Sequence, residues 1–139
     1  MPEPTPGLVI RYAFLWSDEA RRGAEEAAKD RPCAIVVAMR RTAGDLDVIV
    51  APVTHAPPTE NDSVEIPIIV ARKLGLDAGP HWIRIDELNR FAWPGYDLRA
   101  LPGRPGEYAY GMLPETLYKS LRLAILERQR RLQPRVQSR

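Results

Sequence analysis

The amino-acid sequence predicts a mainly β fold of the α+β class, a small barrel or half-open sheet with a short internal helix and a C-terminal helix. Several short runs rich in β-branched and aromatic residues are bounded by turn residues, which is typical of strands. Two of these runs are separated by a short turn, which favours a hairpin. The last apolar pattern of the chain has helical spacing.

The first half of the chain contains the strongest strand signals. Residues 7–16 form an apolar and aromatic run that predicts a first strand, and residues 17–30 predict a connection with one or two helical turns. Residues 31–41 and 45–54 are strand-like, and residues 42–44 suit a hairpin turn. The apolar stretches of this pair are nearly continuous, which is typical of strands buried on both faces.

The middle of the chain alternates loops with short elements. Residues 55–63 contain two adjacent prolines and predict a loop. Residues 64–69 have strand composition, in which Pro67 favours an edge or a bulge. Residues 70–76 predict a short helix that ends near Gly75.

The remaining elements are one short strand, an irregular segment and a helix. Residues 82–85 alternate apolar and polar side chains and predict a strand, and residues 92–106 contain three prolines and three glycines and predict an irregular surface excursion. Residues 114–132 predict the C-terminal helix, with apolar side chains at helical spacing: Leu117, Leu121, Ala124 and Ile125.

Length and composition predict one domain. With 139 residues and 45% hydrophobic content, the chain can bury one sizeable core, which we expect over residues 7–126 with flexible ends at 1–6 and 127–139. The longest apolar runs are too short to cross a membrane, and the N-terminal residues lack the pattern of a signal peptide. The single cysteine, Cys33, fits a reducing compartment and a structural role. We therefore expect a cytoplasmic location.

The charge is distributed unevenly. The formal net charge is +2, but residues 115–139 contain seven basic and two acidic residues, so the remaining body is slightly acidic. Such a body does not indicate a broad nucleic-acid footprint, and any RNA site must depend on a few well-placed cations. The basic tail is either a solvated end or a phosphate contact.

Four short motifs resemble the MazF/PemK family. Arg31-Pro32 opens a strand, and residues 51–54 (APVT) end the next one with the Pro-x-Thr pattern of that family. Residues 84–86 (RID) resemble the Arg-x-Asp of PemK-type members, and residues 111–114 (GMLP) are similar to the sequence before the last helix of the family. Each motif is weak alone, but the four occur in the order of the family.

The resemblance implies an SH3-like barrel of the CcdB/MazF type that forms a homodimer. It implies the toxin of a toxin-antitoxin system, a growth-inhibiting endoribonuclease that cleaves single-stranded mRNA without metal and leaves a 2',3'-cyclic phosphate and a 5'-hydroxyl. It also implies a cognate antitoxin as protein partner, and no cofactor.

The same resemblance indicates the site residues. Arg31 is expected to stabilise the charge on the phosphate, because a guanidinium offers a planar fork of donors. Thr54 is expected to donate its hydroxyl to a phosphate oxygen. His55 follows it directly, and an imidazole with a pKa near 6.5 suits proton transfer. Arg84 and Asp86 share one face of a strand and are expected to bracket a phosphate and its 2'-hydroxyl.

RNA binding is expected to involve Lys29 together with Arg31, Thr54 and Arg84. Each site residue also has an ordinary structural interpretation. Arg31 can pair with Asp30 or Glu26, His55 can hydrogen-bond nearby backbone, and Arg84 with Asp86 can be a surface ion pair. With two histidines, one cysteine and no CxxC or HExxH spacing, the sequence predicts no metal site, and we assign His81 no role.

Two further hypotheses come from other functional classes. The segment before Arg31 is acidic, with Glu19, Glu25, Glu26 and Asp30, where the family commonly has glycines. This acidity would weaken RNA approach, or would mark a docking surface for a basic partner segment. The chain could therefore be a degenerate member that only binds RNA. It could also be a non-catalytic barrel that binds a protein partner, as the gyrase-poisoning CcdB relatives do, although the tail lacks an apolar cluster.

Overall fold

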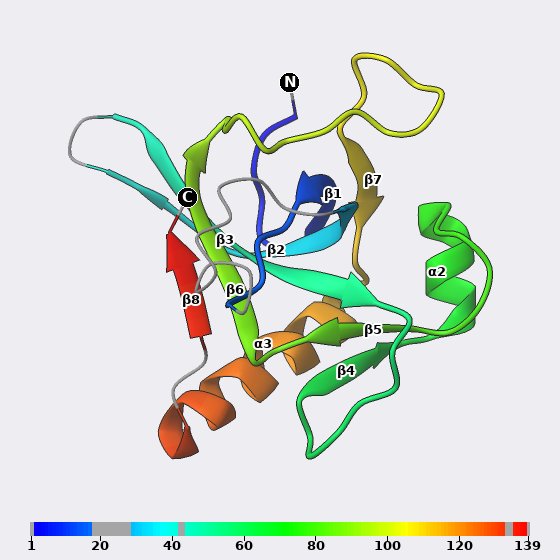
Figure 1. Cartoon of the computed structure of the whole chain (residues 1–139), viewed down its shortest axis with the longest axis vertical. Coiled ribbons are helices and arrows are strands. Elements are labelled where there is room, and N and C mark those ends of the chain that lie inside the picture. The colour runs from blue at the N-terminus through cyan, green and yellow to red at the C-terminus, as the bar shows by residue number, and fades with distance from the viewer. Residues whose placement is uncertain (1, 18–28, 42–43, 133–134, 139) are drawn as a thin grey trace.

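The computed structural model describes residues 2–17, 29–41, 44–132 and 135–138, and within these it contains eight strands and two helices. The predicted mainly β fold, with a short internal helix and a C-terminal helix, is confirmed (Figure 1). The elements in chain order are β1 Leu8–Ala13, β2 Asp30–Arg40, β3 Leu46–Thr54, β4 Ser63–Ile66, α2 Ile68–Leu74, β5 His81–Arg84, β6 Glu87–Trp93, β7 Ala109–Met112, α3 Glu115–Arg131 and β8 Arg135–Ser138.

The strands form one curled sheet in the order β4-β5-β3-β2-β1-β7. The curl follows from β3, which pairs with two strands on the same side. Its residues 46–50 pair with β6, and its last two residues, Val53 and Thr54, pair with β5. All of these pairs are antiparallel, whereas β8 adds to β6 in parallel. The end of β3 is therefore the point where the sheet divides, and the candidate site lies there.

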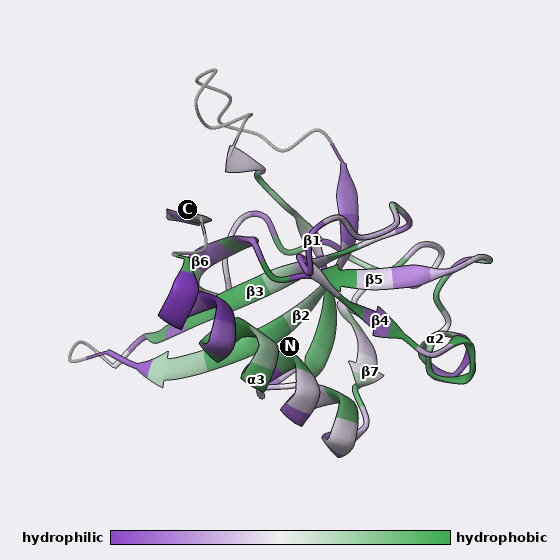
Figure 2. Ribbon diagram, turned by 90° about the horizontal axis from the view of Figure 1, so that it is seen from below, coloured by the Kyte–Doolittle hydropathy of each residue, from purple (hydrophilic) through white to green (hydrophobic). Residues whose placement is uncertain are grey.

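The core has two parts, one on each side of the central hairpin. One part packs the sheet against the helices and includes Leu121 and Ile125, one turn apart on α3. The other part is aromatic, with Tyr12 stacked on Phe91 at a ring distance of 4.6 Å. Figure 2 shows α3 below the apolar strands β2 and β3, with its C-terminal end hydrophilic and the rest of the helix mixed. Cys33 is completely buried, as expected of a structural residue, and burial raises the pKa of its thiol.

The predicted elements are present with small shifts in their ends. The hairpin of β2 and β3 and the helix α3 lie where the sequence places them. The strand expected at 64–69 ends at Ile66, because Pro67 occupies the N-cap position of α2, and the helix begins there rather than at residue 70. The first strand is shorter than 7–16 and ends at Ala13.

Three strands were not predicted, and each has a physical reason. β6 carries buried Glu87 and Asn89 at positions where an alternating pattern would need apolar residues. β7 contains Gly111 with a φ of 139°, a conformation that breaks the usual strand pattern. β8 is a short polar strand that pairs with β6, inside the end expected to be flexible. α3 also continues to Arg131, past residue 126.

Two expectations fall partly outside the described residues. The helical turns expected within residues 17–30 and the acidic residues Glu19, Glu25 and Glu26 lie mostly in the range 18–28, which the structure does not describe. Within the described ranges, neither helix has the length and apolar character needed to cross a bilayer.

Candidate functional site

A cleft of about 610 Å³ lies where the start of β2, the end of β3 and the segment between α2 and β5 meet. Four cationic side chains line it, against two carboxylates, so the cleft favours anions. Its charged and polar lining comprises Arg11, Lys29, Arg31, Arg104, Asp30, Asp77, Thr54, His55, His81 and Tyr110. Four of the residues expected to bind RNA or act in catalysis, namely Lys29, Arg31, Thr54 and His55, are brought together here.

Arg31 faces this cleft without a carboxylate partner in the described part of the chain. Its Nη1 donates to the carbonyl of Val53 at 3.4 Å, and its buried Nε has no hydrogen-bond partner there. The alternative pairing with Asp30 is not found, because Asp30 lies 3.5 Å from Nε of Arg99 instead. Glu26 lies outside the described residues. The guanidinium thus retains donors for an incoming anion.

The Trp16 ring lies against the guanidinium of Arg31. The Cζ atom of Arg31 lies 5.1 Å from the centroid of the Trp16 ring, and the Cζ atom of Arg84 lies 5.4 Å from it. Both distances fall within the range of cation–π attraction. The indole therefore restricts where the Arg31 side chain can lie.

The backbone on either side of Trp16 is held by two buried side chains of β6. Asn89 accepts a hydrogen bond from the backbone N–H of Leu15 at 2.8 Å and donates to its carbonyl at 2.7 Å. Glu87 accepts from the N–H of Ser17 at 2.8 Å and from its hydroxyl at 2.6 Å. The backbone on both sides of Trp16 is therefore hydrogen-bonded to side chains of β6, where a strand would be bonded to the backbone of its neighbour.

Thr54 and His55 occupy the end of β3, at the division of the sheet. The Thr54 hydroxyl oxygen accepts a hydrogen bond from the N–H of Ala56 at 3.1 Å, so its own O–H can donate into the cleft. His55 is held by two partners. Its Nδ1 lies 2.7 Å from the carbonyl oxygen of Pro80, and its Nε2 lies 3.1 Å from both carboxylate oxygens of Asp77.

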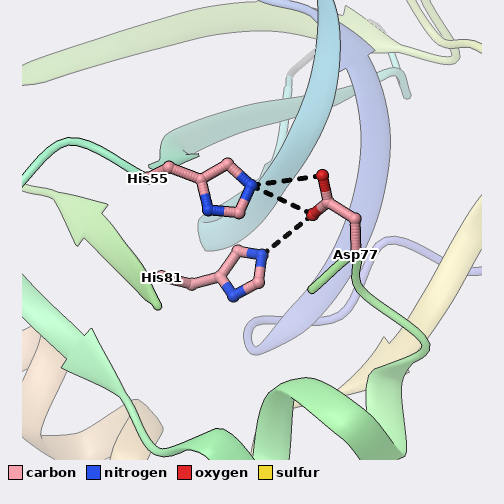
Figure 3. Close-up of side chains that lie close together, drawn as sticks. All are labelled: His55, Asp77 and His81. Carbon is pink, nitrogen blue, oxygen red and sulfur yellow. Dashed lines mark hydrogen bonds and ion pairs between the residues drawn. The ribbon is translucent and has the colours of Figure 1, made fainter. Parts of the chain in front are cut away.

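A second histidine shares the same carboxylate. Nε2 of His81 lies 3.0 Å from Oδ1 of Asp77, and the two imidazole rings lie 4.4 Å apart (Figure 3). His81 is buried as the first residue of β5, whereas Asp77 extends from the exposed segment that follows α2. The three side chains converge from three different parts of the chain.

The electrostatics of this group follow from its hydrogen bonds. The bond to Asp77, and secondly the bond to the Pro80 carbonyl, raise the pKa of His55. The bond from His81 is the main reason that the pKa of Asp77 is lowered, with the bond from His55 adding to it. The carboxylate therefore remains ionised beside the two rings.

Comparison of the chain with family models, with curated proteins and with solved structures gave no match. The resemblance to the MazF/PemK family therefore rests on the four short motifs and stays a prediction.

Arg84 and Asp86 do not line the cleft. Nε and Nη2 of Arg84 lie 2.7 and 2.5 Å from the two carboxylate oxygens of Asp86, and Asp62 approaches at 3.7 Å. The bond to Asp86 raises the pKa of Arg84. This geometry is the ion pair considered as the alternative for these residues, although it is partly buried rather than on the surface. Arg84 shares the Trp16 ring with Arg31.

Several residues of the cleft could not be identified from the sequence. Arg11, Arg104 and Tyr110 come from segments with no recognisable motif, and Arg11 donates to the Tyr110 hydroxyl at 3.1 Å. Asp77 and His81 are four residues apart around a Gly-Pro turn, and His55 lies 22 residues before Asp77. Only the adjacency of β3 and β5 in the sheet brings these groups together.

Proposed function

We propose that this protein is an endoribonuclease that cleaves single-stranded RNA without a metal, leaving a 2',3'-cyclic phosphate and a 5'-hydroxyl. The observation that supports it most is Arg31, a guanidinium without a carboxylate partner in the described residues, set in a cationic cleft beside Thr54 and His55. Two of these residues, Arg31 and Thr54, belong to the motifs that resemble the MazF/PemK family, and His55 directly follows one of the motifs.

The chemistry requires three contributions. The 2'-oxygen attacks the phosphorus and loses its proton while the bond from phosphorus to the 5'-oxygen breaks and that oxygen gains a proton. Charge that gathers on the non-bridging oxygens is stabilised by Arg31 and by the Thr54 hydroxyl. His55 lies beside Thr54 in the same cleft and is the side chain proposed to take the proton from the 2'-hydroxyl and to return it to the leaving 5'-oxygen. Lys29 and the other cations of the cleft hold the neighbouring phosphates.

The biological role proposed is that of a cytoplasmic toxin in a toxin-antitoxin system. It follows from the family resemblance, as do a homodimer and a cognate antitoxin that covers the cleft. A protein-binding barrel is the second candidate, and it is supported by exposed apolar side chains on α3. Leu123 and Leu126 are 66% and 46% exposed on the helix, and Leu132 after it is 58% exposed.

The test is incubation of the purified protein with a long single-stranded RNA in EDTA, followed by mapping of the cut ends. We expect discrete cuts that leave 5'-hydroxyl ends and continue in EDTA. A folded, antitoxin-free protein that leaves the RNA intact would contradict the proposal and favour the partner-binding barrel. Cleavage that stops in EDTA would contradict the metal-independent mechanism.

Replacement of Trp16 tests whether the indole positions Arg31. Trp16→Leu removes a cation–π contact worth roughly 0.5–2 kcal/mol while keeping an apolar side chain. We therefore expect cleavage to slow by about 2- to 30-fold, measured as initial rates on one RNA substrate. Trp93→Leu on β6, a tryptophan whose ring lies against Phe91 rather than against an arginine of the site, is the matched control. Equal rates for Trp16→Leu and the unmodified protein would show that Arg31 needs no support from the indole.

A further inference from the structure

Three side chains of the kinds that bind metals converge at one side of the cleft. His55, Asp77 and His81 each offer one ligand atom, and these atoms all lie within 4.8 Å of one another. His81 is 2% exposed, whereas His55 and Asp77 are 49% and 76% exposed. Figure 3 shows both imidazole rings directed at the same carboxylate. The group is therefore anchored on its buried side and open toward the cleft.

The spacing of the ligand atoms suits a tetrahedral ion. Zinc binds histidine nitrogen and carboxylate oxygen at about 2.0–2.2 Å, which places neighbouring ligand atoms of a tetrahedron roughly 3.4 Å apart. Here Nε2 of His55 and Nε2 of His81 lie 3.1 and 3.0 Å from the Asp77 carboxylate. These two separations need to lengthen by a few tenths of an ångström, which the exposed Asp77 can allow. All three ligand atoms lie within 4.8 Å of one another, so the exposed His55 ring can turn to bring its Nε2 to the distance from Nε2 of His81 that the ion requires.

The tautomer of His55 is set for metal binding. The carbonyl oxygen of Pro80 lies 2.7 Å from Nδ1, so Nδ1 carries a proton and donates it to that carbonyl. Nε2 faces the Asp77 carboxylate, and the contact between these two groups is satisfied by a proton on Nε2, which a metal ion can replace. A backbone carbonyl on Nδ1 is a common way of orienting a histidine that binds metal through Nε2.

We propose that Nε2 of His55, Nε2 of His81 and the Asp77 carboxylate bind one Zn²⁺ ion, with a fourth position open to the cleft. Two imidazoles and a carboxylate favour zinc over magnesium, which prefers oxygen ligands. The cations of the cleft, Arg31 above all, favour an anionic fourth ligand over a neutral one.

The surroundings of His81 limit the affinity of this site for zinc. Nδ1 of His81 is buried without a hydrogen-bond partner in the described residues, and it must carry a proton when Nε2 binds the metal. Loss of such an outer partner typically weakens metal binding by about 10–100-fold. The site is therefore expected to bind zinc reversibly rather than to hold it as a permanent structural ion.

If the protein is the proposed ribonuclease, bound zinc inhibits its cleavage of RNA. Zinc occupies Nε2 of His55, so this ring can no longer transfer a proton to or from RNA. The site would then act as a zinc-dependent brake on a ribonuclease that itself needs no metal.

Binding is measured on the full chain, stripped with EDTA, dialysed and titrated with ZnCl₂ in a calorimeter, with Co²⁺ as a spectroscopic probe. We expect one ion per chain and the visible absorption bands of tetrahedral Co²⁺. Asp77→Asn keeps the shape and a hydrogen-bond acceptor but removes the anionic ligand, and it should weaken binding at least about 10-fold. Glu65→Ala, which removes an exposed carboxylate from β4, should leave binding unchanged.

The outcomes separate the two proposals. Binding that is absent, or equal in Asp77→Asn and in the unmodified protein, would overturn the zinc site. Cleavage that proceeds unimpeded at saturating Zn²⁺, with Mg²⁺ as the control ion, would overturn the braking role. A zinc-free protein that does not cleave RNA would overturn the proposed function, while the binding data would still decide the zinc site.

Discussion

Arg31→Ala is expected to reduce RNA cleavage by about 10²–10³-fold, the loss typical for removal of one preorganised donor from a developing oxyanion. The size of the effect follows from the surroundings of the guanidinium. It is half-buried, rests on Trp16 and has no carboxylate partner in the described residues, so it reaches the phosphate with little prior neutralisation. Initial rates on a single-stranded RNA in EDTA measure the loss.

Two variants make the Arg31 experiment specific. Arg40→Ala removes the same charge from the opposite, exposed end of β2, and its rate should remain within about twofold of the unmodified protein because Arg40 does not line the cleft. Arg31→Lys keeps the charge but loses the planar fork of donors, and its cleavage rate should lie between the rates of Arg31→Ala and Arg40→Ala. If Arg31→Ala and Arg40→Ala cleave at the same rate, Arg31 has no special role.

The fold could be predicted where local pattern and tertiary structure agree. The hairpin of β2 and β3 reads as two apolar runs because both faces are covered, and α3 shows helical spacing at Leu121 and Ile125. The strand β6 could not be predicted, because Asn89 and Glu87 are buried for their hydrogen bonds rather than for hydrophobicity. Asparagine and glutamate are mostly exposed in proteins, so their presence does not indicate a buried strand.

The residues of the candidate site could also be predicted only where they are close together in the sequence. Thr54 and His55 are neighbours in sequence and remain neighbours in the cleft, whereas Asp77 and His81 join them only through the pairing of β3 with β5. Arg84 and Asp86 were predicted to share one face of a strand, but β5 ends at Arg84 and Asp86 lies in the bend before β6. Their ion pair is formed across this bend, and the strand period could not distinguish it from a phosphate site. Charge pairing is a tertiary property that spacing does not encode.

Asn89→Ala is expected to lower the free energy of unfolding by about 3–5 kcal/mol, because it leaves the buried N–H and carbonyl of Leu15 without partners and opens a cavity. Urea unfolding measures the change as a lower midpoint. The exposed amide Gln129→Ala on α3 is the matched control and should shift stability by less than about 0.5 kcal/mol.

The charge variant Asn89→Asp distinguishes hydrogen bonding from packing at this position. It nearly conserves volume and retains an acceptor for the Leu15 N–H, but it loses the donor to the Leu15 carbonyl and places a carboxylate in a fully buried position. We expect a loss of stability as large as that of Asn89→Ala, and a small loss would show that volume alone matters. Since the same hydrogen bonds hold the backbone beside Trp16, a folded Asn89 variant should also cleave RNA more slowly, which connects a buried amide of β6 to Arg31 in the cleft.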